Sequence, residues 1–173
     1  SQDSTYADLQ SMISCFPSDS VTLLKQDGRG KRDAVKKGFD AGVHEYLAIV
    51  DADLTVDLQD SIDAIKIGMS SPMTLINCAR IYYPMQKKAM RFFNYIGNRV
   101  FAVLLSYVTG QTIGDALCGT KCMSREVYNK LELSGYWASA RDPFGDFSIL
   151  FWVSRYGHEI LNYPVRYYAR TSG

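Results

Sequence analysis

An apolar run at residues 46–50 ends abruptly at two acidic residues, Asp51 and Asp53. Such a run is typical of a strand that is buried on both faces of a sheet. Two carboxylates at the end of a buried strand are costly unless another group compensates their charge. This junction therefore predicts a sheet in which the end of a strand carries a functional site.

Strand patterns alternate with helix patterns along the chain. Helical periodicity predicts helices at residues 6–16, 31–43, 57–69, 87–108, 125–133 and 147–156. Apolar runs predict strands at residues 21–24, 46–50, 73–78 and 159–168. The residues expected to face inward from the third helix are Leu58, Ile62, Ile65 and Met69. This order predicts an α/β fold with a largely parallel sheet flanked by helices, and ligands beyond the carboxyl ends of its strands.

The composition fits one globular domain with a sizeable core. Of the 173 residues, 47% are hydrophobic and 21% are charged, which excludes general disorder. The formal net charge of +1 argues against a strongly electrostatic nucleic-acid binder. The longest apolar run, residues 100–108, is about half the length that a membrane-spanning helix needs. We therefore expect no membrane span and no nucleic-acid partner.

The cysteine and histidine pattern argues against zinc. The four cysteines contain no C-x-x-C pair, and His44 and His158 lie far from them in sequence. We therefore expect no zinc site and no disulfide framework, but free thiols in a reducing compartment.

The two acids after the apolar run predict a metal site. Asp51 and Asp53 are two residues apart, so both carboxylates can turn toward one hard divalent cation. Mg²⁺ or Mn²⁺ held in this way commonly also binds substrate phosphates. The alternative is a polar loop in which Asp53 or Asp57 caps the next helix.

A glycine-containing basic loop precedes the helix predicted at residues 31–43. Gly28 and Gly30 let backbone N–H groups approach an anion, and Arg29, Lys31 and Arg32 add positive charge. The loop lacks the spacing of a nucleotide-binding P-loop. It predicts a phosphate or diphosphate site, and the alternative is a solvated basic turn.

The near-neutral net charge conceals a long basic interval. Between Asp63 and Asp115 there is no acidic residue, and six basic residues fall there: Lys66, Arg80, Lys87, Lys88, Arg91 and Arg99. Many aromatic residues accompany them, which suits a surface that contacts anionic lipid headgroups. An ordinary basic helix face with core aromatics is the alternative. Arg80 and Arg91 are the best candidates for binding a phosphate by bidentate contacts.

Two further loops combine acids with glycine. Residues 115–120 begin with Asp115, and residues 142–146 contain Asp142 and Asp146. Either loop could orient a nucleophile, and either could equally be a turn or a helix cap.

In this order, the segments resemble the family 2 glycosyltransferases of the GT-A fold, in the polyprenyl-phosphate, dolichol-phosphate-like branch. Residues 1–5 resemble the end of the family's S-x-D-x-T segment, residues 30–35 its G-K-G-x-A-V loop, and residues 51–53 its D-x-D motif. The Y-P-M…A-M-R…N-x-x-G-N stretch is matched at residues 83–98. The remaining matches are residues 115–121, 142–147 and 164–170.

The resemblance implies a Rossmann-related GT-A fold with an interfacial helical segment at residues 82–107. The implied reaction moves a sugar, with inversion, from a nucleotide-sugar donor to a polyprenyl (dolichyl or undecaprenyl) phosphate. It takes place at the cytoplasmic face of the membrane. UDP-glucose and GDP-mannose both stay open as donors, as does a homo-oligomer.

The resemblance also implies roles for individual residues. The expected metal ligands for Mg²⁺ or Mn²⁺ are Asp51, Asp53 and Thr55. Lys31 and Asp33 belong to the loop expected near the donor, and Arg80 and Arg91 would bind the acceptor phosphate. The expected catalytic residues are Asp115 as a base and Arg170 on a phosphate of the closed site.

The chain departs from the family pattern in two ways. Arg32 stands where the family's loop has its second glycine. The family's first strand and helix and its C-terminal membrane helices have no counterpart, so residues 1–173 are predicted to be a single catalytic domain truncated at both ends.

Two other functions compete with this hypothesis. Residues 47–56 also resemble the first motif of haloacid-dehalogenase-type phosphatases, with Asp51 as nucleophile and Asp53 as general acid. The other alternative is a non-catalytic, membrane-peripheral module that has kept the fold.

Overall fold

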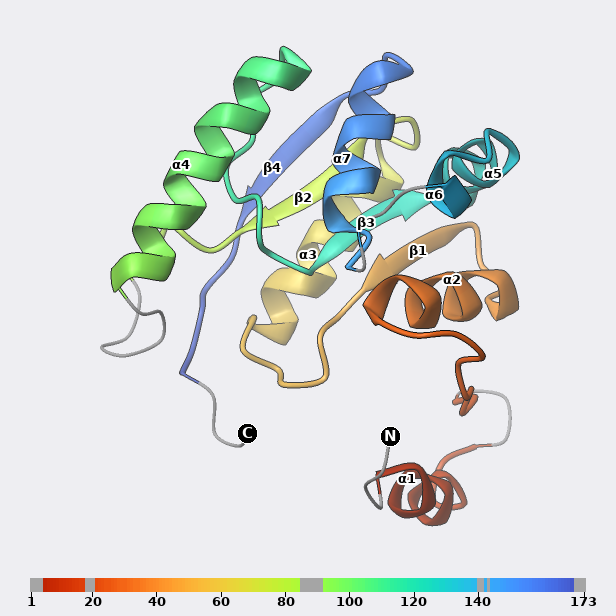
Figure 1. The fold of residues 1–173 in the computed structure, drawn as a ribbon. Coiled ribbons are helices and arrows are strands. Elements are labelled where there is room, and N and C mark those ends of the chain that lie inside the picture. Colours follow the sequence, from red (N-terminus) through yellow and green to blue (C-terminus); the bar gives the residue numbers. More distant parts are fainter. Residues whose placement is uncertain (1–4, 18–20, 85–91, 140–141, 143, 170–173) are drawn as a thin grey trace. The chain divides into compact units, whose positions relative to one another are not determined.

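The computed structural model describes residues 5–17, 21–84, 92–139, 142 and 144–169 (Figure 1). The chain divides into two compact units, residues 1–42 and residues 43–173, which are described separately.

The described residues of the first unit form the helices α1 (Thr5–Ile13) and α2 (Lys31–Ala41). Both predicted helices are confirmed, with earlier ends than expected. Gly30 at the start of α2 has a φ of 86°, a left-handed conformation that glycine adopts without steric cost. The strand predicted at residues 21–24 is wrong, because the described part of this segment is paired with no neighbouring strand.

The second unit contains a sheet and several helices. Its elements in chain order are β1 (Tyr46–Ile49), α3 (Leu58–Met69), β2 (Leu75–Ala79), α4 (Phe92–Thr109), β3 (Lys121–Ser124), α5 (Arg125–Leu133), α6 (Tyr136–Ser139), α7 (Asp146–Arg155) and β4 (Ile160–Pro164). The helices and strands predicted in this region are confirmed in position, although β4 ends earlier than expected and the start predicted for α4, at residues 87–91, lies outside the described residues. The expectation that the first of these strands is buried on both faces is wrong, because β1 lies at the edge of the sheet and its residues alternate between half-buried and buried. The sequence did not predict β3 or α6.

In the described residues the sheet has four strands in the order β1-β3-β2-β4 (Figure 1). β3 is antiparallel to both of its neighbours, whereas β2 and β4 are parallel. The fold class is therefore α/β as predicted, but the sheet is mixed and not mostly parallel. Because β3 runs against the other strands, its amino end lies at the same edge as the carboxyl ends of β1, β2 and β4.

α3 faces the sheet with its small residues, Ser61, Ala64 and Gly68. A Cβ atom added to Gly68 would lie 1.6 Å from the Tyr46 hydroxyl oxygen, so helix and strand approach too closely for a larger side chain. The inward face predicted for this helix is therefore wrong. Of the residues expected inside, Ile65 is half-buried, and the exposed ones are Leu58, Ile62 and Met69.

α4 has a small and partly polar buried face. Asn98, Ala102 and Leu105 are buried, whereas Phe93 and Tyr107 are 83% and 88% exposed. Val100, Val103, Leu104 and Val108 are exposed as well, so a continuous apolar face points away from the core. Within the described residues, α4 and the other helices are too short or too polar to cross a bilayer.

Candidate functional site

Several predicted site residues meet at one edge of the sheet in the second unit. Asp51 and Asp53 follow β1, Arg80 follows β2, and Asp115 lies in the loop that leads into β3. Residues 165–168 follow β4 at the same edge. The antiparallel direction of β3 brings Asp115 here, which a purely parallel sheet would not do.

The loop after β1 is a tight turn. The Leu54 amide donates a hydrogen bond to the Asp51 carbonyl at 3.1 Å, and Leu54 has a φ of 49°. A left-handed conformation at a residue other than glycine stores strain that the surrounding structure must hold. This acidic turn, residues 51–54, places both carboxylates on one short segment at the edge of the sheet.

The buried Thr55 orients Asp53. Asp53 Oδ1 accepts hydrogen bonds from the Thr55 hydroxyl at 3.0 Å and from the Thr55 amide at 3.3 Å. Thr55 was predicted as a third metal ligand, and here its hydroxyl contacts the carboxylate of Asp53. Asp57 caps α3 by accepting from the amides of Gln59 at 2.9 Å and Asp60 at 3.1 Å.

The segment after β4 forms hydrogen bonds with the residues that follow the turn. The Tyr168 amide donates to the Thr55 carbonyl at 2.8 Å, and the Asp57 amide donates to the Arg166 carbonyl at 3.1 Å. The Tyr168 hydroxyl donates to Asp57 Oδ2 at 3.0 Å. Arg166 pairs with Asp60, and hydrogen bonds from Arg166 lower the pKa of that carboxyl despite the opposing effect of partial burial.

Arg80 and Asp115 form a buried ion pair. Arg80 Nε lies 2.7 Å from Asp115 Oδ2, and Arg80 Nη2 lies 3.0 Å from Oδ1. Oδ2 also accepts from the Arg80 amide at 3.1 Å, and Oδ1 accepts from Asn98 Nδ2 at 2.7 Å and from the Leu117 amide at 3.0 Å. Burial alone would raise the pKa of Asp115, but the hydrogen bonds and charge of Arg80 outweigh burial and lower it.

Asparagine side chains fix the loop that carries Asp115. Asn77 Nδ2 donates to the Asp115 carbonyl at 3.0 Å and to Asn162 Oδ1 at 3.1 Å. The Asn162 oxygen also accepts from the Gly114 amide at 2.7 Å. A Cβ atom at Gly114 would lie 2.8 Å from the Tyr82 hydroxyl oxygen, so this position has little space for a side chain. Asp115 is therefore held rigidly by neighbouring strands and by α4.

Tyr167 connects the two halves of the site. Val56 and Tyr167 form an isolated antiparallel bridge next to the acidic turn. The guanidinium carbon of Arg80 lies 5.0 Å from the centre of the Tyr167 ring, which is the geometry of a cation–π contact. The acidic turn and the Arg80–Asp115 pair therefore belong to one cluster. The sequence did not identify Tyr167 as a site residue. Its only signal was its position in residues 164–170, the last segment that resembles the family.

A second buried pair lies next to this cluster. Lys121, the first residue of β3, is fully buried, and its Nζ lies 3.5 Å from Asp146 Oδ1 at the start of α7. Lys121 Nζ also donates to the carbonyl of Cys118. A lysine in a four-residue segment gave no signal of a buried strand, since lysine is almost never fully buried unless it is paired.

Of the other predicted site residues, two belong to the first unit and two lie outside the described residues. Lys31 and Asp33 lie in the first unit, where Asp33 Oδ2 accepts from the Gly28 amide at 2.8 Å. Arg91 and Arg170 lie outside the described residues. Asp142 accepts from the amides of Phe147 at 3.0 Å and Ser148 at 3.1 Å, so it serves as a helix cap for α7.

The chemistry of the acidic turn fits a hard divalent cation. It offers carboxylate oxygens from two acids, of which Asp53 is oriented by Thr55. No group of three or more histidine, cysteine, aspartate or glutamate side chains suited to a metal occurs in the described part of the chain. Mg²⁺ is often bound by one or two carboxylates, with water and substrate phosphates completing its coordination. The donor set therefore fits a cation that binds together with a phosphate-containing substrate.

Comparison with models of protein families and with characterised proteins finds no match to this sequence.

Proposed function

We propose that this chain carries the catalytic site of an inverting family 2 glycosyltransferase with a GT-A-like fold. Its substrates would be a nucleotide-sugar donor and a polyprenyl phosphate. The observation that carries the proposal is the cluster at one sheet edge, where Tyr167 connects the acidic turn to the buried Arg80–Asp115 pair. The cluster combines a carboxylate pair for a metal with a fixed cation for a phosphate.

In this proposal the acidic turn binds the donor through Mg²⁺ or Mn²⁺. Asp51 and Asp53 would hold the cation, and the Thr55 hydroxyl keeps Asp53 in position. The bound cation would neutralise the charge that develops on the departing nucleoside diphosphate. The turn is tied to the segment after β4, which limits its movement when the donor binds.

Arg80 is the proposed contact for the acceptor phosphate. Asp115 binds Nε and Nη2, and the side chain of Arg80 keeps 12% of its surface exposed. A guanidinium fixed in this way loses little conformational freedom when it binds a phosphate.

Asp115 is better suited to positioning Arg80 than to accepting a proton. Both of its carboxylate oxygens already accept hydrogen bonds, and its pKa is lowered. A lipid phosphate is ionised at neutral pH and is already nucleophilic, so positioning can supply most of the catalysis. The proposed role of Asp115 is therefore to position Arg80 and not to act as the base that the sequence predicted, and Asp115 remains part of the proposed site.

The proposed membrane contact is the exposed apolar face of α4. Asn98 on the opposite face of the helix binds Asp115, so α4 belongs to the site. The helix follows a basic segment that contains Lys87, Lys88 and Arg91 in sequence. Apolar side chains beside basic residues suit a helix that lies in the headgroup layer. Such a position would bring the site to the acceptor.

A sugar-transfer assay tests the proposal. We expect the full chain to transfer labelled sugar from UDP-glucose or GDP-mannose to a polyprenyl phosphate in the presence of Mg²⁺ or Mn²⁺. Asp53→Asn should lower transfer by about 100-fold or more, since a neutral amide binds the cation weakly and cannot compensate its charge. Asp63→Asn is the matched control, because Asp63 lies on α3 and pairs with Lys66.

Transfer at the wild-type rate by Asp53→Asn would contradict the proposed metal site. Release of inorganic phosphate from a phosphomonoester, without sugar transfer, would favour the phosphatase alternative. Vesicle binding without any transfer across the donor panel would favour the non-catalytic module.

A further inference from the structure

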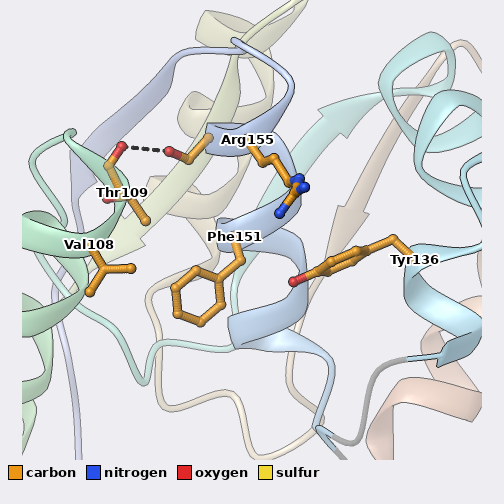
Figure 2. A pocket seen from close by; sticks show the side chains of 6 residues that line it. Val108, Thr109, Tyr136, Phe151 and Arg155 are labelled. Atoms are coloured by element: carbon orange, nitrogen blue, oxygen red, sulfur yellow. Dashed lines mark hydrogen bonds between the residues drawn. The ribbon is translucent and has the colours of Figure 1, made fainter.

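A pocket of about 340 Å³ lies between the end of α4, α6 and α7 (Figure 2). It is lined by Val108, Thr109, Tyr136, Phe151, Ser154 and Arg155. On α4, Val108 is ten residues beyond Asn98, which corresponds to about 15 Å along the helix axis. The pocket is therefore distinct from the cluster at the sheet edge.

The lining combines an apolar floor with groups that bind anions. Val108 and Phe151 supply apolar surface, and Figure 2 shows the Tyr136 hydroxyl directed toward Phe151, with the Arg155 guanidinium beside the space between the two rings. The Ser154 hydroxyl donates to the Thr109 carbonyl at 2.6 Å, which ties α7 to the end of α4. A guanidinium next to a phenolic hydroxyl suits a phosphate group.

The pocket is continuous with the exposed face of α4. Val108 lines the pocket, and it also follows Val100, Val103, Leu104 and Tyr107 on the exposed side of the helix. A ligand with an anionic group at Arg155 could therefore place a hydrocarbon chain over Val108 and along the helix. Free phosphate would leave this apolar surface uncovered.

We propose that the pocket binds the phosphate headgroup of an anionic membrane phospholipid, with an acyl chain on α4. The proposal rests on the membrane contact of the proposed function and adds a second lipid site, separate from the acceptor site. With α4 flat in the headgroup layer, one end of the helix meets the acceptor and the other end meets a structural lipid. The bound lipid would fix the orientation of the site toward the membrane.

The two tryptophans of the sequence give a direct signal for this pocket. Trp137 follows Tyr136 and Trp152 follows Phe151, so both lie beside lining residues. We expect dihexanoyl phosphatidic acid, used below its micelle concentration, to change the tryptophan fluorescence saturably. Arg155→Gln should weaken this binding by about tenfold or more. Lys66→Gln removes one positive charge from an exposed position on α3 and should leave the binding unchanged.

Two further ligands and one further variant distinguish binding of an anionic phospholipid from binding of free phosphate or of any phospholipid. Inorganic phosphate should bind at least about tenfold more weakly than the phospholipid, and dihexanoyl phosphatidylcholine should bind as weakly. Val108→Asn should also weaken phospholipid binding, because it removes part of the apolar surface. Equal binding of inorganic phosphate, equal binding of phosphatidylcholine, or unchanged binding by both variants would overturn the proposal.

The two proposals fail separately. If the chain transfers sugar but shows no fluorescence response to phosphatidic acid, the second lipid site is wrong and the proposed function stands. If it binds the lipid through Arg155 but transfers no sugar, the proposed catalytic function is wrong.

Discussion

The Arg80–Asp115 pair is the most deeply buried of the ion pairs described at the site. Asp115 is fully buried and Arg80 nearly so, and the pair joins residues 35 positions apart in sequence. Removing one partner of a buried pair leaves the other charge without compensation, which costs far more than losing an exposed pair.

Asp115→Asn should lower the free energy of unfolding by about 3 to 5 kcal/mol, because it leaves the Arg80 charge buried without its partner. Urea denaturation followed by circular dichroism measures this change. Glu126→Gln is the control, since the Glu126–Lys130 pair on α5 is exposed and screened by solvent and should contribute little to stability. A loss for Asp115→Asn as small as that of the control would contradict the buried pair.

The stability difference between the wild type and Asp115→Asn should depend on pH. The folded-state pKa of Asp115 is below the ordinary carboxyl value of 3.8, so its charge stabilises the folded state above that pH. The stabilisation should decrease as the pH falls below 3.8 and through the folded pKa. Urea midpoints between pH 3 and pH 7 would show the two proteins converging only at the acidic end.

The sequence identified candidate residues that the fold brings to one sheet edge, but not how they interact. Asp51, Asp53, Arg80 and Asp115 were each identified as candidate site residues, and they meet at one sheet edge. The sequence did not predict that Arg80 binds Asp115, because a contact across 35 residues depends on the strand order.

Most helices were predicted well in position, but the inward face of α3 and the strand β3 were not. The periodicity of α3 placed its large apolar residues inside, but the close approach of Gly68 to Tyr46 turns the small face toward the sheet. Apolar periodicity identifies the apolar face of a helix. It does not show whether that face packs against the core or lies at the surface, since much of any protein surface is apolar. β3 was missed because a buried strand of four residues that begins with lysine has no apolar pattern.

The exposed face of α4 gives a prediction at this scale. The combined variant Val103→Ser, Leu104→Ser and Tyr107→Ser should fold normally, with little change in stability, because these side chains are exposed. Its binding to vesicles that contain anionic phospholipid should fall by about tenfold or more, measured by co-sedimentation. Leu133→Ser on α5 is the control for removing an exposed apolar side chain. Unchanged binding of the combined variant would contradict the membrane contact.

In the second unit, the core surrounds three thiols. Cys78 lies in β2, Cys122 in β3, and Cys118 in the loop before β3, and all three are fully buried in one apolar cluster. Burial is the largest cause of the rise in pKa, to about 11 for Cys118 and about 12 for Cys122. These thiols therefore report whether the core opens as a whole.

Cys15 is exposed and should react rapidly with a thiol reagent such as DTNB in the native state. Cys78, Cys118 and Cys122 should react much more slowly and with similar rates, because all require opening of the same core. Reaction rates by mass spectrometry, with and without urea, test this expectation. Rapid native labelling of any of the three would show that the core opens locally.

The contacts of residues 55–60, which follow the acidic turn, with residues 166–168 limit when the candidate site can form during synthesis. The Tyr168 hydroxyl and Asp57 are 111 positions apart, and Arg166 and Asp60 are 106 positions apart. A ribosome makes the acidic turn early, but the turn acquires these partners only after residue 168 has left the exit tunnel. Until then the strained Leu54 conformation lacks the hydrogen bonds that hold the neighbouring residues. The nascent chain can therefore pair β1 with β3 before it can complete the site that β1 supports.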